Sequence, residues 1–140
     1  MKDGLDSFGS NPVFIRVYLL PRAQWTMKLL IVDDHAPMRR LIRRVLSDLV
    51  SDIEECGDGS AALAAYDQHR PNWVVMDIEM CQMDGITATR EILKAFPTAK
   101  IVIVSKHDDE QIREAAHAAG ACGYVLKENL LAIRELLEKP

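Results

Sequence analysis

Four apolar runs in this chain lead directly into polar side chains that can bind or transfer charged groups. The residues at the ends of these runs are Asp33 and Asp34, Asp77, Ser105 and Lys127. Two unit charges 4 Å apart repel by about 4 kcal/mol at an effective dielectric of 20, so three clustered carboxylates need counter-charge. The lysine supplies one positive charge, and a divalent cation would supply two more.

The oxygen chemistry of this set favours Mg²⁺ or Mn²⁺ over zinc, because no histidine or thiolate belongs to it. Mg²⁺ uses one or two carboxylates and leaves room for phosphate oxygens. A carboxylate beside such an ion, a hydroxyl and a lysine is an arrangement for capturing a phosphoryl group as an aspartyl phosphate. The alternative without chemistry is that Asp33 and Asp34 cap a helix and that Asp77 ends a strand by chance.

The elements that would position these groups alternate between strands and helices from Met27 onward. Expected strands cover 28–33, 52–56, 73–77, 100–105 and 123–126. A first helix has Pro37 in its first turn, and further helices are expected over 61–68, 86–95, 109–119 and 130–138. The first helix has an apolar stripe of Met38, Leu41, Ile42, Val45, Leu46 and Leu49, and off that stripe lie Arg39, Arg40, Arg43 and Arg44.

Continuous apolar strands, rather than alternating ones, indicate a parallel sheet that is buried on both faces. The sequence therefore predicts an α/β fold: a flavodoxin-like, doubly wound, five-stranded parallel sheet of order 2-1-3-4-5 with helices on both faces. In this order the first and third strands are neighbours, and sites lie beyond their carboxyl ends. We therefore expect the three aspartates to converge there, with Ser105 and Lys127 approaching from the side.

The bulk properties fit one globular domain. The chain has 140 residues and a formal net charge of −4, which gives no indication of a nucleic-acid-binding element. The cysteines Cys56, Cys81 and Cys122 are far apart, and we interpret them as free thiols in a reducing, cytoplasmic compartment.

No run reaches the roughly 18–20 apolar residues of a membrane span. The nearest candidate, residues 13–20, is too short and contains Arg16. We expect residues 1–26 to be a non-core N-terminal extension and residues 27–140 to form the domain. The alternative is that residues 13–20 dock on the domain as an extra strand or helix.

The strand-end motifs resemble a known family. They are "VDD" (32–34), "DIEMCQMDG" (77–85), "VIVS" (102–105) and "GYVLK" (123–127). Together they resemble the receiver domain of bacterial two-component response regulators, and "VDDH", "SKHDDE" and "GYVLKE" are most similar to the subfamily that often carries a C-terminal helix-turn-helix of the LuxR/NarL type. The resemblance implies a CheY-like fold, phosphorelay signalling, and no catalysis beyond the protein's own phosphorylation and slow autodephosphorylation.

The resemblance also implies the ligands of the metal. Asp77 would be the phospho-acceptor. Mg²⁺ would be held by Asp33, Asp34, Asp77 and the backbone carbonyl of Glu79, with Asp34 favoured over Asp33 as a direct ligand.

The remaining roles concern the phosphoryl group. Lys127 would bind a phosphoryl oxygen, Ser105 would move toward the arriving phosphate, and Tyr124 would turn inward behind it. A long side chain follows Ser105 where the family commonly has a small one, so we expect the lifetime of the acyl phosphate to depend on Glu79, Lys106 and His107.

The implied phosphoryl donor is a sensor histidine kinase or a phosphotransfer protein, which in this family contacts the arginine-bearing first helix. The alternative is that these arginines form only a solvated helix face. The implied readout surface, and the surface of a homodimer, comprises the segments 109–119, 123–126 and 130–138. The chain is then either a stand-alone receiver or the receiver portion of a longer transcriptional regulator.

Two positions depart from the family pattern. Cys81 and Glu128 stand where proline is usual. We interpret Cys81 as structural. Without the proline, a cis bond between Lys127 and Glu128 would cost about 3–4 kcal/mol.

Three alternatives fit less of the sequence. An aspartate-nucleophile phosphatase of the haloacid-dehalogenase kind needs a second aspartate two residues after the first, where this chain has Glu79. An interaction module that has lost phosphorylation lacks an acid or the lysine, and here the set is complete. A flavin-binding flavodoxin needs a hydroxyl- and glycine-rich loop after the first strand, whereas "DDHAPMRR" would repel a phosphate.

Overall fold

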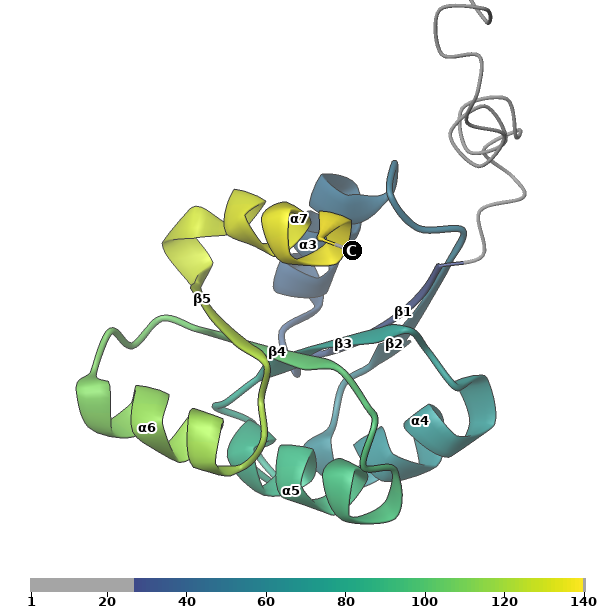
Figure 1. The fold of residues 1–140 in the computed structure, drawn as a ribbon. Helices are drawn as coiled ribbons and strands as arrows, with labels where there is room; N and C mark the ends of the chain where they lie inside the picture. The colour runs from purple at the N-terminus through teal and green to yellow at the C-terminus, as the bar shows by residue number, and fades with distance from the viewer. Residues whose placement is uncertain (1–26, 140) are drawn as a thin grey trace, which may run out of the picture.

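A computed structural model of the chain describes residues 27–139, which form one parallel sheet covered by helices (Figure 1). The strands lie in the order β2-β1-β3-β4-β5, which confirms the predicted doubly wound topology. The expected N-terminal extension over 1–26, and the alternative that residues 13–20 dock on the domain, lie outside the described residues. The strands are β1 (Lys28–Val32), β2 (Asp52–Cys56), β3 (Trp73–Asp77), β4 (Ile101–Ser105) and β5 (Gly123–Leu126).

Helices cover both faces of this sheet. On one face lie α3 (Ala36–Leu46) and α7 (Leu131–Glu138). On the other lie α4 (Ala62–His69), α5 (Gly85–Ala95) and α6 (Glu110–Ala118), as Figure 1 shows. Two short 3-10 turns, Gly59–Ala61 and Lys127–Asn129, complete the described elements.

The central strands are buried on both faces because successive side chains point to opposite sides. In β3, Trp73 and Val75 join the core beneath α3 and α7, whereas Val74 and Met76 join the core beneath α4, α5 and α6. Burial of each such side chain contributes about 1.5–3 kcal/mol. The strand that carries Asp77 is therefore held firmly from both sides.

The first helix differs from its prediction at one position. Leu41 was expected on the apolar stripe, but its side chain is 41% exposed, so that prediction is wrong. Ile42 and Leu46 define the centre of the buried face, and Leu41 lies about 100° around the helix from Ile42. Because Leu41 is directly adjacent to Ile42 in the sequence, it lies at the margin of the buried face of α3.

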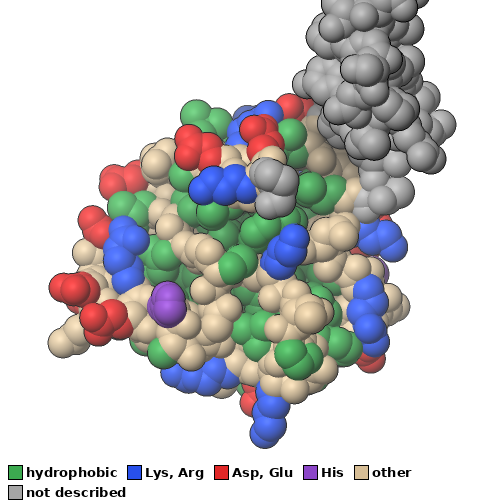
Figure 2. Space-filling view, viewed as in Figure 1, with side chains coloured by type: hydrophobic (Ala, Val, Ile, Leu, Met, Phe, Trp, Pro, Cys, Tyr) green, Lys and Arg blue, Asp and Glu red, His purple; other side chains and the backbone are tan. Residues whose placement is uncertain are grey.

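Two arginines of the same helix have partners on the sheet. Arg39 and Arg43 both pair with the Glu55 carboxylate on β2, at 2.9 Å and 2.7 Å. The hydrogen bonds and charges of these arginines outweigh partial burial and lower the pKa of Glu55. Along the described part of the chain no helix is long and apolar enough to cross a membrane. On the face shown in Figure 2, acidic and basic side chains are interspersed rather than sorted by sign.

Candidate functional site

The three strand-end carboxylates lie together at the carboxyl edge of the sheet. Val32 of β1 pairs with Met76 of β3, so the next residues of the two strands, Asp33 and Asp77, come side by side. Asp33 is 1% exposed and Asp77 is 4% exposed, whereas Asp34 faces solvent. One carboxylate oxygen from each aspartate lies within 4.8 Å of the other two. The convergence predicted from strand order is confirmed.

Lys127 enters this cluster from the end of β5. Its Nζ atom lies 3.0 Å from Oδ1 of Asp77 and 3.5 Å from Oδ2 of Asp33. Burial works against the charged ammonium, but the hydrogen bond and charge of Asp77, together with Asp33, raise the pKa of Lys127. The lysine is therefore a charged partner shared by the two buried acids.

The surroundings of Asp77 disfavour its ionised form. Burial raises the pKa of Asp77, the hydrogen bond from Lys127 lowers it, and the charge of Asp33 raises it again, with a net rise. The carboxylate is consequently poised to gain from additional positive charge.

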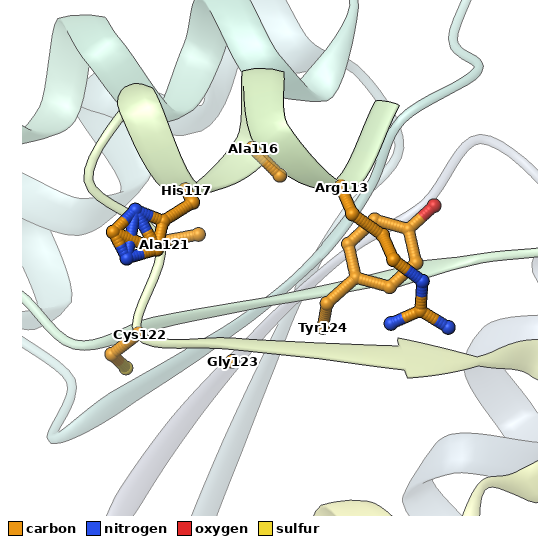
Figure 3. Close-up of a pocket in the computed structure, with 7 residues that line it drawn as sticks. All are labelled: Arg113, Ala116, His117, Ala121, Cys122, Gly123 and Tyr124. Carbon is orange, nitrogen blue, oxygen red and sulfur yellow. The ribbon is translucent and has the colours of Figure 1, made fainter. Parts of the chain in front are cut away.

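Ser105 and Tyr124 meet at the backbone of His107, in the loop after β4. Ser105 is buried, and its Oγ accepts a hydrogen bond of 3.0 Å from the His107 amide. The Tyr124 hydroxyl donates a hydrogen bond of 2.7 Å to the His107 carbonyl. The Arg113 guanidinium lies over the Tyr124 ring, 4.6 Å from the ring centroid. Both side chains line one end of a groove between α6 and β5 (Figure 3). The structure thus links the hydroxyl of the site to the expected readout surface.

The three residues expected to set the lifetime are also brought together. The Glu79 carboxylate pairs with Nε2 of His107 and lies 3.4 Å from Nζ of Lys106. The hydrogen bond from His107, aided by Lys106, lowers the pKa of Glu79. These contacts join the loop after β3 to the loop after β4 on the exposed side of the site.

The loop between Asp77 and α5 is shaped by close backbone approaches. Asp84 caps α5, and its Oδ1 accepts hydrogen bonds of 2.9 Å and 3.0 Å from the amides of Ile86 and Thr87. The Gly85 amide donates a 2.8 Å hydrogen bond to the Ile78 carbonyl. This explains the Asp84-Gly85 pair: the acid starts the helix, and the glycine lets its first turn approach the acceptor strand.

A family model describes the same arrangement. The response regulator receiver domain matches residues 29–139. The chain belongs to this family. Receiver domains are in general signalling modules.

Several curated relatives agree with this assignment. The chain is 34% identical over 107 residues to the transcriptional regulatory protein DegU of Brevibacillus brevis, which covers 73% of this chain and 44% of DegU. It is 37% identical over 101 residues to the chemotaxis protein CheY of Bacillus subtilis (strain 168), covering 71% of this chain and 84% of CheY. The receiver domain therefore spans less than half of DegU but most of CheY.

Solved structures show the same fold. A LuxR-family two-component response regulator from Aurantimonas sp. SI85-9A1 superposes with a TM-score of 0.72 at 33% identity, covering 80% of this chain and 85% of that one. A LuxR-family DNA-binding response regulator from Staphylococcus aureus gives a TM-score of 0.72 at 26% identity, covering 78% of this chain and 93% of that one. The predicted resemblance to the LuxR-type regulators is confirmed.

Receiver domains bind Mg²⁺ through acidic residues, and the carboxylates of this receiver fit such an ion. Oδ1 of Asp33 accepts a 2.8 Å hydrogen bond from the His35 amide. Oδ2 of Asp33 is buried and, among the described residues, has no hydrogen-bond partner. A buried carboxylate oxygen whose cationic contact is Nζ of Lys127 at 3.5 Å, inside an all-oxygen acidic cluster, can also accept a hard divalent cation. The role of the Glu79 backbone carbonyl as a Mg²⁺ ligand stays a prediction.

The loop after β3 also brings Cys81 to the edge of the site. The Sγ atom of Cys81 lies 3.6 Å from Oδ2 of Asp34, and the side chain is exposed. This contact between two loops is compatible with the structural role expected for Cys81, which stays a prediction. In the sequence, Cys81 lies four residues after Asp77, where the family usually has proline. Across the described residues no peptide bond is cis, including the bond between Lys127 and Glu128.

Proposed function

We propose that this receiver takes a phosphoryl group onto Asp77 from the phosphohistidine of a sensor histidine kinase or a phosphotransfer protein. The observation that carries the proposal is the 3.0 Å contact between Asp77 and Lys127, inside a cluster that also holds Asp33 and Asp34. A carboxylate oxygen of Asp77 attacks phosphorus, the P–N bond to imidazole breaks, and the imidazole leaves with the electron pair of that bond.

The residues around Asp77 have two roles, one in binding the phosphoryl group and one in binding the metal ion. Lys127 binds a phosphoryl oxygen and offsets the charge that gathers on the transferring group. Asp33, Asp34, Asp77 and the carbonyl of Glu79 are the ligands we assign to Mg²⁺, which supplies two positive charges next to the phosphoryl oxygens when bound.

The phosphoryl group then changes what Ser105 contacts. It adds about −1.5 to −2 charge, which attracts the Ser105 hydroxyl away from the His107 amide. Tyr124, which bonds the carbonyl of the same His107, follows this change at the surface of α6, β5 and α7. This differential contact is what a population shift requires. We assign readout, and a homodimer where one forms, to that surface.

We assign the receiver to residues 27–140 and place residues 1–26 outside its core. The same phosphoryl transfer is expected whether the chain is a stand-alone receiver or the receiver portion of a transcriptional regulator. Deletion of residues 2–26 is expected to leave the thermal stability and the phosphorylation of Asp77 unchanged. A large fall in Tm on deletion would contradict this boundary.

The decisive experiment is to treat the full chain with acetyl phosphate or beryllofluoride in the presence of Mg²⁺. We expect an adduct that depends on the metal, is lost in Asp77→Asn, and persists in the control Asp52→Asn, whose carboxylate is exposed at the opposite end of the sheet. Intact mass and phosphate-affinity electrophoresis measure the acyl phosphate, and fluorine NMR measures the beryllofluoride adduct. Rapid multiple turnover of phosphate esters would instead support an aspartate-nucleophile phosphatase, and no adduct at all would support a pure interaction module.

A further inference from the structure

The Arg39 side chain lies between α3 and the carboxyl edge of the sheet. Its Nη1 atom donates a hydrogen bond of 2.6 Å to the backbone carbonyl of Asp33. Its Nε atom donates a hydrogen bond of 2.9 Å to Oε1 of Glu55 on β2. The side chain is 20% exposed, whereas that of Arg43, which binds the same Glu55, is 44% exposed. Arg39 is therefore turned toward the site, and its guanidinium joins the end of β1 to β2.

The carbonyl that Arg39 binds belongs to the peptide unit between Asp33 and Asp34, two of the three clustered aspartates. The Asp33 amide donates a 3.0 Å hydrogen bond to the Cys56 carbonyl, and Oδ1 of Asp33 accepts one of 2.8 Å from the His35 amide. Rotation of the peptide unit between the two acids would turn their side chains relative to each other. The bond from Arg39 opposes that rotation from outside the acidic cluster.

The two hydrogen bonds of Arg39 require the geometry of a guanidinium. This group carries five N–H donors in a rigid planar fork, and here two of its nitrogens serve Asp33 and Glu55 at once. A lysine has a single ammonium on a flexible stem, so it supplies the charge without the fork. The contact with the two acceptors is therefore specific to arginine.

Two neighbouring arginines of α3 lack this contact. Arg43 also pairs with Glu55, at 2.7 Å, and its Nη2 donates a 3.4 Å hydrogen bond to the Ile53 carbonyl, which lies farther from the carboxyl end of β2. Arg40 follows Arg39 in the sequence and is exposed. Arg43 therefore provides a control for the pairing with Glu55, and Arg40 provides one for positive charge on the same helix.

We infer that Arg39 is a positioning residue, which fixes the peptide unit between Asp33 and Asp34 and so holds their carboxylates in place for Mg²⁺. The inference rests on the function proposed above, in which these acids bind the metal ion. Loss of a group that orients metal ligands by hydrogen bonding typically costs about 10–100-fold in metal affinity or activity. Because Arg39 binds Asp33 and Glu55, we expect its loss to weaken metal binding more than the transfer step at Asp77.

Metal binding can be measured without any phosphoryl donor. The full chain, freed of metal with a chelator and desalted, is titrated with Mn²⁺, whose free-ion signal in electron paramagnetic resonance falls on binding. We expect the affinity to fall by about tenfold or more in Arg39→Ala, and Arg39→Lys to stay well below the wild type because it restores only the charge. Arg43→Ala and Arg40→Ala should bind Mn²⁺ nearly as the wild type does.

The Mg²⁺ dependence of phosphorylation distinguishes positioning from a loss of stability. Acetyl phosphate is the donor, since this small molecule needs no docking on α3. We expect the Mg²⁺ concentration at half-maximal rate to rise by about tenfold or more in Arg39→Ala, with a smaller change in the rate at saturating Mg²⁺. A variant that is merely less stable would lose rate in proportion to its unfolded fraction, which urea denaturation measures, and would keep the wild-type midpoint.

Three results would overturn the inference: wild-type Mn²⁺ affinity in Arg39→Ala, full recovery in Arg39→Lys, or an equal loss in Arg43→Ala. If Arg39→Ala does not fold, Arg39→Lys decides the question by itself. Failure of the proposed function gives a different pattern. In that case the wild type and the variants bind Mn²⁺ as expected, but the wild type forms no adduct on Asp77, and the positioning role of Arg39 still stands.

Discussion

Gly85 lies so close to the backbone of Asp77 that a Cβ atom on the glycine would collide with the Asp77 carbonyl oxygen. The first turn of α5 is therefore packed directly against the residue that carries the acceptor. Any side chain at Gly85 must move either the helix or the strand end.

We expect Gly85→Ala to lower the free energy of unfolding by about 1–3 kcal/mol, the usual cost of overpacking a tight site. The displaced strand end should also slow formation of the beryllofluoride adduct. Gly57→Ala is the matched control, because its new methyl group would meet the flexible end of Arg39 at 3.3 Å and would come no closer than 4.0 Å to backbone, at the Asp33 carbonyl oxygen. Urea denaturation of both variants checks this, and equal losses in the two would contradict it.

Removal of the buried charge at position 77 should stabilise the metal-free protein near neutral pH. The pKa of Asp77 is raised on folding, chiefly by burial, so the folded state favours the protonated acid. Stability is therefore full below the unfolded pKa and is lost as the pH rises through the folded pKa. Asp77→Asn has no carboxyl group to ionise at this position, so its Tm should exceed that of the wild type near neutral pH. The difference in Tm should shrink toward zero as the pH falls.

The measurement is a series of thermal denaturation curves between acid and neutral pH, with a chelator present. The exposed Asp52→Asn serves as the control for removing one negative charge. Added Mg²⁺ should stabilise the wild type and leave Asp77→Asn less affected. A gain in Tm that is equal at every pH would show that Asp77 does not titrate in the way its surroundings require.

Lys127 is expected to be needed for the reaction as well as for the balance of charge. Lys127→Ala leaves Asp77 and Asp33 without their shared ammonium, which further raises the pKa of Asp77 and removes a partner of the phosphoryl oxygens. We expect the rate of phosphorylation by acetyl phosphate to fall by about tenfold or more, in line with the loss of one charge-stabilising group. Lys94→Ala, on the exposed side of α5, should react like the wild type.

The lifetime of the acyl phosphate should depend on the contact that joins Glu79 to Lys106 and His107. Loss of this contact opens the exposed side of the site to water, because the two loops are no longer held together there. We expect an altered rate of dephosphorylation in Glu79→Ala, Lys106→Ala and His107→Ala. Phosphate release after removal of the donor measures it. If all three variants decay at the wild-type rate, the three residues do not set the lifetime.

Two threonines of α5 offer a paired test of hydroxyl burial. Oγ1 of Thr89 is buried and lacks a hydrogen-bond partner within the described residues. Thr87 instead donates a 2.8 Å hydrogen bond to Asp84. We expect Thr89→Val to stabilise the protein by about 1 kcal/mol and Thr87→Val to destabilise it by about 0.5–1.5 kcal/mol. Opposite signs in urea denaturation support the assignment, and a destabilised Thr89→Val would refute it.

The sequence by itself determined the order of the sheet and the set of residues at its carboxyl edge. Runs such as Trp73 to Met76 are apolar at every position, which is typical of strands covered on both faces. Once the strands are parallel and their order is known, the residues at their ends must converge. Asp33, Asp77 and Lys127 could be placed together for that reason, although they are far apart in the chain.

Only the tertiary structure decided which loop residues touch. The contact of Cys81 with Asp34, the contacts of Glu79 with Lys106 and His107, and the approach of Gly85 to Asp77 all depend on the path of irregular backbone. No repeat in the sequence encodes such a path, because loops lack the regular spacing of a helix or a strand. The exposure of Leu41 has a related cause: a helical pattern marks a face, but the neighbouring elements decide where that face ends.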